Sequence, residues 1–501
     1  MIYPSQKDFI NFTKKGNLIP VYQEILGDLE TPVSAYLKLA QDSRYTFLLE
    51  SVEGGEKVSR YSFLAESPEL VFKSKDKKAE IITFKGKKEI KKSFLLTGSP
   101  LDEIKKIMSR YKFVEAKGLP RFCGGFLGYI GYDTVRFFEH LPKKPKDDLK
   151  IPDVLLSLTK NLIIFDHFDH KIKIVCCVEV DPKSSVTKKI LAYKSAQKTI
   201  KKTIAKLQEP VLKPKIKLSK PSPLKVTSTF SESNFKKAII QAKKKIHSGD
   251  IIQTVLSQRF KTTLSTNALN VYRTLRTINP SPYMYLLRFD DLNIAGSSPE
   301  LLVRCEDGVV ETRPIAGTRP RGKDEKQDLA LARNLLRDPK ERAEHIMLVD
   351  LGRNDIGRVC KKGSVQLSEF MNIEYYSHVM HIVSNVKGAL AKNKTAFDVI
   401  EACFPAGTVS GAPKIRAMEI IDDLEPVSRG PYAGCIGYLS FSGNLDTCIT
   451  IRTIVIKGKT AYVQAGAGIV ADSNPKKEYL ETRNKARAQI SAIELANNTF
   501  A

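Results

Sequence analysis

Two segments of the chain each carry a pair of glutamates three residues apart, in a pattern that predicts a helix. Each opens with an acidic or amide residue followed by proline, which suits the N-cap and first helical position, and residues three apart share a helix face. If the two faces converge, they can hold a hard cation that prefers oxygen ligands, such as Mg²⁺. Two solvated faces would show the same pattern, because the helix dipole favours glutamate near an N-terminus. The pairs are Glu341 and Glu344 in residues 338–350 and Glu478 and Glu481 in residues 474–490.

Two glycine-rich segments could bind an anion through main-chain N–H groups. Residues 463–470, VQAGAGIV, place Gly466 and Gly468 around one alanine, where a ligand can approach the backbone closely. This is not a dinucleotide-binding fingerprint, because the third glycine is missing and the surroundings are those of a strand. Residues 407–414, GTVSGAPK, lack the spacing of a P-loop, but a glycine-rich loop that enters a helix at Pro413 is a fair anion site.

Four polar side chains stand in apolar or glycine-rich runs and need a partner. Arg452 lies in CITIRTIVI, which predicts a strand. Its planar fork suits a carboxylate ligand, although a structural salt bridge explains it equally well. Gln253 shares an apolar strand face in DIIQTVLSQRF, where a buried amide must form hydrogen bonds. Tyr432 and His381 complete the set, and a satisfied core histidine is the simpler interpretation of His381.

The elements that position these residues form an α+β pattern. The 501 residues, 42% of them apolar, can bury a large core. The N-terminal half is rich in strand-like runs, including a hairpin over residues 162–180 whose DHFDH sequence predicts a turn rather than a metal cluster. Residues 209–224, rich in proline and lysine, predict a linker. Helices are predicted at 235–246, 339–351, 413–422 and 475–497, and strands at 250–260, 435–441, 448–458 and 460–470.

Composition limits the possible classes of function. The net charge of +26 would suit a nucleic-acid-binding protein, an alternative that salt-dependent retention of duplex DNA would support. The excess is mainly lysine without interleaved aromatics, which indicates solvated faces rather than a stacking groove. Eight cysteines without CxxC spacing predict reduced, mostly buried thiols. No apolar run of about 18 residues and no secretory signal pattern occurs, so we expect a soluble cytoplasmic protein with no membrane or nucleic-acid partner.

Eight segments, read in order, resemble the chorismate-binding enzymes, specifically the large subunits (component I) of anthranilate synthases. The resemblance is strong over residues 225–497 and weaker in the N-terminal half, where LLES, RYSF and GGFLGYIGYD carry it. It implies large antiparallel sheets packed face to face with helices on the outside. The eight segments are RPIAGTRPRG (313–322), EHIMLVDLGRNDIGRV (344–359), YSHVMHIVS (376–384), PAGTVSGAPKIRAMEII (405–421), GPYAGCIGY (430–438), LDTCITIRTI (445–454), VQAGAGIVADS (463–473) and ETRNKARA (481–488).

The resemblance implies a lyase that converts chorismate and ammonia to anthranilate and pyruvate in tryptophan biosynthesis. It implies Mg²⁺ as cofactor, bound by Glu344 and Glu481 with Glu341 and Glu478 assisting, and acting on the ring carboxylate and the departing ring hydroxyl. His381 would act near that hydroxyl as a proton donor or an orienting group. The implied substrate-binding residues are Gly317, Thr318, Tyr432, Arg452, Gly466, Ala467, Gly468 and Lys485, and the implied catalytic residues are His381, Thr408 and Gln253.

Two residues separate this interpretation from related ones. Ala316 stands where the aminodeoxychorismate synthase subunit, which remains the alternative, carries a lysine able to attack the ring. Gln253 stands where enzymes that make isochorismate carry a lysine base, and an amide cannot activate water in that way. Ammonia is therefore the expected nucleophile. Because the segment around Cys435 is no glutaminase motif, the resemblance implies a separate glutamine amidotransferase subunit (component II), in a heterotetramer of two large and two small subunits.

The N-terminal half resembles the regulatory region of the family. Residues 1–208 would carry regulation and residues 225–497 the chorismate-binding catalytic domain. Ser51 and the run Pro282, Tyr283 and Met284 stand at positions that bind the feedback inhibitor L-tryptophan in the family, although ordinary strand packing would also explain Ser51. Bound tryptophan would favour a state that cannot close on the substrate.

Overall fold

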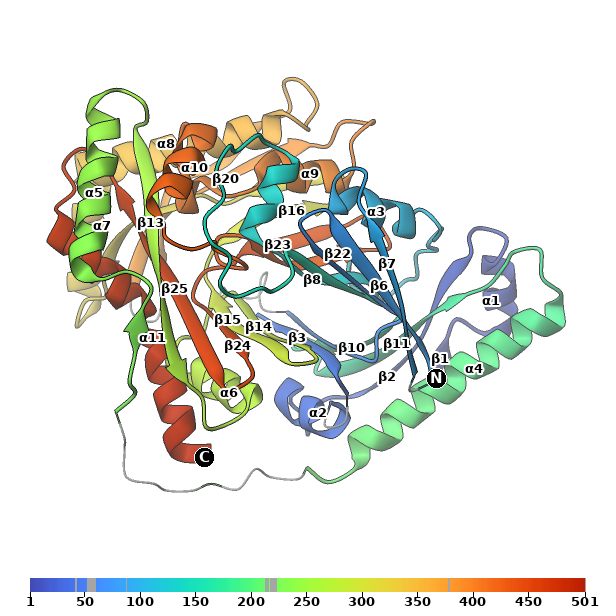
Figure 1. Cartoon of the computed structure of the whole chain (residues 1–501). Coiled ribbons are helices and arrows are strands. Elements are labelled where there is room, and N and C mark those ends of the chain that lie inside the picture. The colour runs from blue at the N-terminus through green and yellow to red at the C-terminus, as the bar shows by residue number, and fades with distance from the viewer. Residues whose placement is uncertain are drawn as a thin grey trace.

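A computed structural model describes residues 1–40, 43–51, 60–86, 88–211, 216, 223–376 and 379–500. Over these residues the chain forms two large antiparallel β-sheets, of 13 and 12 strands, with helices around them (Figure 1). The α+β class and the antiparallel sheets predicted from the sequence are confirmed. No helix in these ranges is long and apolar enough to cross a membrane.

Both sheets combine strands from before and after the segment 209–224. The first runs in the order β1 (Ile2–Tyr3), β2 (Leu18–Leu26), β11 (Lys171–Glu179), β10 (Asn161–Asp166), β4 (Tyr61–Glu66), β3 (Tyr45–Glu50), β14 (Tyr283–Phe289), β15 (Leu292–Ser298), β24 (Thr453–Lys457), β25 (Thr460–Ile469), β13 (Gln253–Thr263) and β12 (Thr227–Ser228), with β21 (Gly411–Ala412) on β13. The second runs β18 (Ile315–Pro320), β20 (Val379–Ala389), β17 (Val309–Thr312), β16 (Leu301–Glu306), β23 (Leu445–Ile449), β22 (Cys435–Ser440), β8 (Gly125–Ile130), β9 (Val154–Thr159), β5 (Leu70–Lys75), β6 (Lys78–Lys85) and β7 (Lys88–Leu95), with β19 (Gln366–Tyr375) on β20.

The helices begin where the sequence offers caps. Ser99, Ser185 and Ser231 each accept a main-chain N–H at the start of a helix. The helices are α1 (Gln6–Phe12), α2 (Pro32–Leu39), α3 (Pro100–Met108), α4 (Val186–Gln208), α5 (Glu232–His247), α6 (Ala268–Ile278), α7 (Glu325–Arg337), α8 (Pro339–Gly357), α9 (Ala396–Cys403), α10 (Lys414–Leu424) and α11 (Pro475–Phe500), with short 3₁₀ turns η1 (Tyr132–Phe137) and η2 (Gly407–Val409). The predicted helices at 235–246, 339–351, 413–422 and 475–497 are thus confirmed as α5, α8, α10 and α11.

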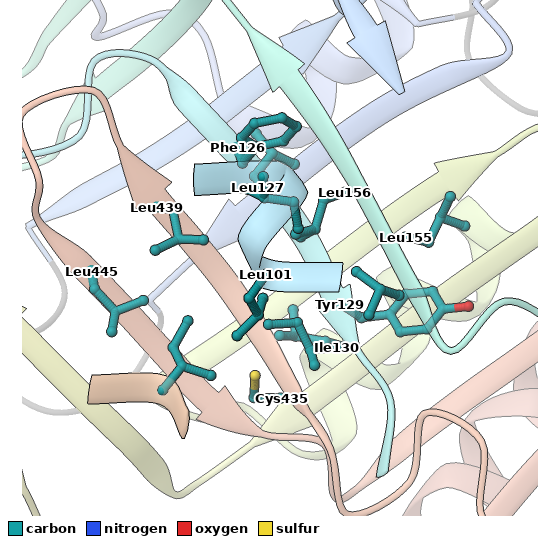
Figure 2. Packing of buried hydrophobic residues seen from close by; sticks show 14 of the residues in the cluster. Leu101, Phe126, Leu127, Tyr129, Ile130, Leu155, Leu156, Cys435, Leu439 and Leu445 are labelled. Atoms are coloured by element: carbon teal, nitrogen blue, oxygen red, sulfur yellow. The ribbon is translucent and has the colours of Figure 1, made fainter. Parts of the chain in front are cut away.

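The alternation of side chains along the strands places them in two hydrophobic cores. Tyr285 and Leu287 of β14 enter the largest core, whereas Met284 and Leu286 enter a second one that also holds residues of α4, α6 and α11. Figure 2 shows part of the largest core, where side chains of β8, β9, β22 and α3 meet. The sheet that carries β13 and β25 therefore packs against both of these cores.

The prediction of one strand over residues 448–458 is wrong. β23 ends at Ile449 in the second sheet, and β24 begins at Thr453 in the first. Arg452 lies in the connection between them with φ +52°, a left-handed conformation that few L-residues adopt. The continuous run of β-branched residues gave no indication of this break, because strand propensity does not indicate which sheet a residue joins.

Three other predictions concern turns, linkers and thiols. Residues 162–180 form the expected hairpin, β10 and β11, and His167 in its turn contacts the Ser62 hydroxyl at 2.7 Å. All eight cysteines are free, as expected. Within the predicted linker, residues 212–215 and 217–222 lie outside the described residues. The functional division into 1–208 and 225–497 stays a prediction.

Candidate active site

The two acidic helices pack on different sheets, α11 on the first and α8 on the second. α11 packs on β25 and α5, and α8 packs on β18 and β20 (Figure 1). Burial raises the pKa of Glu344, and the charges of Glu341 and Glu481 raise it further, against the opposing effect of Lys485. Glu344 on α8 and Glu481 on α11 are therefore near enough for their charges to interact, which places the two predicted glutamates in one region of the structure.

The second glutamate of α11 belongs to the same cluster. Burial raises the pKa of Glu478, Glu481 raises it as well, and Lys340 at the start of α8 lowers it. Glu481 forms an ion pair with Lys485 one turn later, at 2.7 Å. Two helices of one chain thus bring several carboxylates into a partly buried space, where the charge of Glu481 disfavours the ionisation of Glu344 and Glu478.

The fourth glutamate, Glu341, faces the loop that carries Gly317. Arg319 donates to Glu341 at 2.9 Å and to Asp338 at 2.8 Å. Gly317 has φ +68°, and a Cβ there would lie 3.0 Å from Leu335 and 3.2 Å from a Glu341 oxygen. Glycine is required at this position because its conformation and the close neighbours both exclude a side chain.

The acidic cluster fits a hard divalent cation by donor type. Carboxylate oxygens are the ligands that Mg²⁺ prefers, and a cation would relieve the repulsion that raises the pKa of Glu344 and Glu478. Within the described part of the chain, no group of three or more His, Cys, Asp or Glu side chains is arranged to hold a metal ion by itself. Mg²⁺ commonly completes its coordination with water and substrate oxygens.

Two of the predicted site side chains lie close to glycines of β25. A Cβ on Gly466 would lie 2.8 Å from the Tyr432 hydroxyl, and one on Gly468 would lie 2.6 Å from the Gln253 amide nitrogen. β24 pairs only with residues 460–463 of β25, whereas β13 pairs along 460–469. In the described ranges no strand covers the second edge of β25 at residues 464–469, which leaves that edge open to a ligand.

Gln253 begins β13 and is 4% exposed. Its amide lies close enough to Glu344 to lower the pKa of that carboxyl, but its Oε1 has no hydrogen-bond partner in the described structure. A buried acceptor without a partner costs about 1–3 kcal/mol, so a ligand or water is the natural complement. The predicted need for a partner is met only in part by the protein.

Arg452 points its guanidinium at the same space. It donates to the Lys485 carbonyl at 2.5 Å, and burial lowers the pKa of Arg452, against the charges of Tyr432 and Glu481. Among the described residues it forms no ion pair with a carboxylate, so the structural salt bridge is not found. Tyr432 is 7% exposed and burial raises its pKa to about 12, which keeps the phenol protonated.

His381 is held by the loop that carries Gly317 and Thr318. Its Nδ1 lies 2.9 Å from the Gly317 carbonyl and 3.1 Å from the Thr318 hydroxyl. Since a carbonyl only accepts, Nδ1 carries the proton and Nε2 is the free lone pair. Burial lowers the pKa of His381, so the ring is neutral near pH 7. This state suits an orienting or accepting role better than proton donation.

A buried carboxyl that the sequence analysis missed is Glu300, between β15 and β16. It is 9% exposed, and burial raises its pKa to about 7, against the effects of the Thr408 hydroxyl and Lys485. The Thr408 hydroxyl approaches without hydrogen-bond geometry, and both residues line a cavity of about 40 Å³. The available signal was an acidic residue in SSPEL between two apolar strands, where burial is expected and a charge is unusual.

The four predicted tryptophan-binding residues also come together. Met284 pairs with Glu50 in the register of β14 and β3, and Ser51 follows at once. The buried Ser51 hydroxyl has no partner in the described residues, and Tyr283 donates to Asp446 at 2.9 Å. Pro282 is buried just before Tyr283. These positions form one end of two neighbouring strands of the first sheet, β3 and β14.

Comparisons with known proteins cover nearly the whole chain. Residues 60–491 match the family model described as chorismate binding enzyme. Anthranilate synthase component 1 of Acetivibrio thermocellus is 49% identical over 500 residues, 99% of each chain, and that of Aquifex aeolicus is 48% identical over 99% of this chain and 98% of its own. A crystal structure of anthranilate synthase component I from Streptococcus pneumoniae superposes with a TM-score of 0.75 at 37% identity, over 93% of this chain and 99% of that one. The menaquinone-specific isochorismate synthase of Escherichia coli shares the fold, with a TM-score of 0.68 at 19% identity over 98% and 99% of the two chains.

Proposed function

This chain belongs to the chorismate-binding enzymes, and within that family to component I of anthranilate synthase, and we propose that it joins chorismate and ammonia to give anthranilate and pyruvate at the site described above. The observation that carries the proposal is the cluster of glutamates from α8 and α11, in which burial and mutual repulsion raise the pKa of Glu344 and Glu478. Such a cluster is costly unless a cation joins it.

Glu344 and Glu481 would hold Mg²⁺, with Glu341 and Glu478 beside them. When bound, the ion would neutralise the charge on the ring carboxylate and the charge that develops on the departing hydroxyl. Lys485, paired with Glu481 at 2.7 Å, adds positive charge at the same place.

The other anionic end of chorismate would meet main-chain amides and a guanidinium. The open edge of β25 between Gly466 and Gly468 offers the N–H groups of alternate residues, since the others point to β13, and main-chain N–H groups form anion sites in other proteins. Arg452, free of any carboxylate in the described structure, and the protonated Tyr432 hydroxyl would hold the enolpyruvyl carboxylate. The substrate would thus be oriented from both ends.

Glu300 is our candidate for the acid that protonates the departing ring hydroxyl. Its pKa of about 7 keeps a useful protonated fraction near neutral pH, which a general acid requires. The Thr408 hydroxyl beside it would orient the proton. His381, neutral and bound through Nδ1 to the Gly317 carbonyl, would orient or accept. Gln253 would position a polar group without acting as a base.

Ammonia is the proposed nucleophile, supplied by a glutamine amidotransferase partner, component II, in an expected heterotetramer. Ala316, 8% exposed in β18 beside Gly317, has no amine that could attack the ring. The related alternative, formation of aminodeoxychorismate, is therefore less favoured. Free ammonium at high concentration should support turnover without the partner.

Product analysis tests the proposal directly. The purified chain is incubated with chorismate, Mg²⁺ and ammonium at alkaline pH, and the product is followed by fluorescence and mass. Anthranilate is the expected product. Accumulation of aminodeoxychorismate would support the alternative, and the absence of any amination product would reject both. Retention of duplex DNA without turnover of chorismate would instead support a nucleic-acid-binding protein.

Ser51→Arg is expected to leave turnover intact and to remove inhibition by L-tryptophan. Among the described residues the buried Ser51 hydroxyl has no hydrogen-bond partner, and it lies beside β14, so a long charged side chain would occupy the proposed effector site. The measurement is anthranilate formation against tryptophan concentration. Ser93→Arg, on exposed β7, is the matched control and should stay inhibitable. Full inhibition of the Ser51 variant would show that the effector binds elsewhere.

A further inference from the structure

One fully buried ion pair lies behind the substrate-facing residues. Arg429 is 2% exposed and Glu425 is 5% exposed, and they meet through two hydrogen bonds of 2.6 and 3.0 Å. Neither residue faces the open edge of β25. Removing two charges from water is costly, and a buried pair is often no more stable than apolar residues of the same shape. The contacts that this ion pair makes with other residues therefore indicate whether it has a role besides stabilising the fold.

Arg429 uses its remaining N–H groups on two segments that carry site residues. It donates to the Val409 carbonyl at 2.7 Å, next to Thr408 in η2. It also donates to the Val255 carbonyl at 2.7 Å, on β13 opposite Gly468. One planar guanidinium thus holds the turn of Thr408 at a set distance from β13, because its N–H groups point in fixed directions.

The same guanidinium lies against two aromatic rings. Its central carbon is 5.6 Å from the ring centre of Tyr432 and 4.7 Å from that of Tyr132. The positive charge of Arg429 also opposes the rise in the pKa of Tyr432 that burial causes. The orientation of the Tyr432 ring is therefore coupled to the position of Arg429.

Glu425 extends the contacts to β25. Its Oε1 accepts from the Ser257 main-chain N–H at 2.8 Å and from the Ser257 hydroxyl at 2.9 Å. Gln464 of β25 donates to that hydroxyl at 2.8 Å, and Ser257 is the register partner of Gly466. The carboxylate thus supports the part of β13 and β25 that presents the glycine amides.

We infer that Arg429 and Glu425 are positioning residues for chorismate: they set the mutual placement of Thr408, Tyr432 and the Gly466–Gly468 edge without touching the substrate. The inference rests on the substrate roles proposed above. The ion pair contacts the Tyr432 ring, Val409 beside Thr408, and Val255 and Ser257, which pair with Gly468 and Gly466. A displacement of about 1 Å at such groups can cost roughly 10²-fold in rate.

Arg429→Lys tests the inference because it keeps the charge and loses the planar fork. We expect kcat/KM for chorismate to fall about 10²-fold, with a higher KM, because the groups that bind the substrate are displaced. The Mg²⁺ concentration for half-maximal rate should stay unchanged, since Arg429 contacts neither Glu344 nor Glu481. Arg288→Lys is the matched control: Arg288 donates to the Ala40 and Ser43 carbonyls and lies 5.9 Å from the Tyr36 ring, outside the site.

A double-mutant comparison separates positioning from general stability. If Arg429 acts through Tyr432, the losses caused by Arg429→Lys and Tyr432→Phe should be less than additive. If Arg429→Lys does not fold, Ser257→Ala, which removes one hydroxyl opposite Gly466, should raise the KM for chorismate while the melting temperature changes little. Unchanged kinetic constants in the folded variants, strictly additive losses or an equal loss in Arg288→Lys would overturn the inference. A wild-type chain that does not convert chorismate would refute the proposed function itself.

Discussion

Glu344→Gln and Glu481→Gln are each expected to abolish the turnover of chorismate while the protein stays folded. Glutamine keeps the shape of glutamate and removes the charge that would hold the cation. Neutralisation of transition-state charge by a metal is worth several kcal/mol, and about 1.4 kcal/mol corresponds to a tenfold change, so the loss should reach roughly 10³-fold or more. Stability should not fall, because Glu344 and Glu481 repel each other in the folded chain.

Thermal melting provides a readout besides activity. Mg²⁺ should raise the melting temperature of the wild-type chain, because a ligand that binds only the folded state stabilises it. The shift should disappear in both variants. Glu494→Gln, on the same helix α11 but beyond the cluster, should keep both the shift and the activity. Near-normal turnover with an unchanged Mg²⁺ requirement in Glu344→Gln would exclude this carboxylate as a ligand.

Glu300→Gln should lower kcat by about 10²–10⁴-fold with a much smaller effect on the KM for chorismate, since an amide has no acidic proton to donate. The pH dependence of the wild-type rate constant should show the ionisation of Glu300. Because burial raises the pKa of Glu300 to about 7, the carboxyl is protonated below that pH and ionised above it. The rate constant, corrected for the fraction of free ammonia, should therefore fall as the pH rises through about 7, and this limb should be absent in the variant.

Glu306→Gln is the matched control for this experiment. Glu306 lies at the end of β16, the strand that follows Glu300, and burial raises its pKa too, but it pairs with Arg121 at the surface. Its replacement should leave kcat and its pH dependence unchanged. A Glu300→Gln variant with an unaltered pH profile would assign the proton to another group, and His381 would then be the first to examine.

The net charge of +26 shows that amino-acid composition alone does not identify the function of this chain. The ion pairs of the structure show many of the acidic residues already matched, as in Lys171 and Lys173 with Glu24 and Lys75 with Asp153. Charge excess by itself reports on solubility and association rather than on fold or reaction. The motifs in the second half of the chain were the stronger indication of function.

Much of the local structure could be predicted because local rules cause it. Asp338 and Asn474 each stand directly before a proline and accept main-chain N–H groups from the first helical turn. The starts of α8 and α11 therefore follow from a few neighbouring residues. The spacing of Glu341 and Glu344 also determines that they share a face. The glycines at 466 and 468 were identifiable as positions of close approach, and a Cβ there would lie only 2.8 Å from the Tyr432 hydroxyl and 2.6 Å from the Gln253 amide nitrogen.

The sequence alone thus indicates the type and capping of the helices, the candidate acidic and glycine residues, and the family. The folded structure was needed to show that the charges of Glu344 and Glu481 interact, that Arg452 stands in a left-handed connection between two sheets, that Glu300 is buried with a raised pKa, and that Arg429 reaches Val255, 174 residues away in the chain. The physical reason is that helix caps and periodicity depend on contacts over a few residues, whereas burial, pKa and ion pairing depend on which distant segments come together in space.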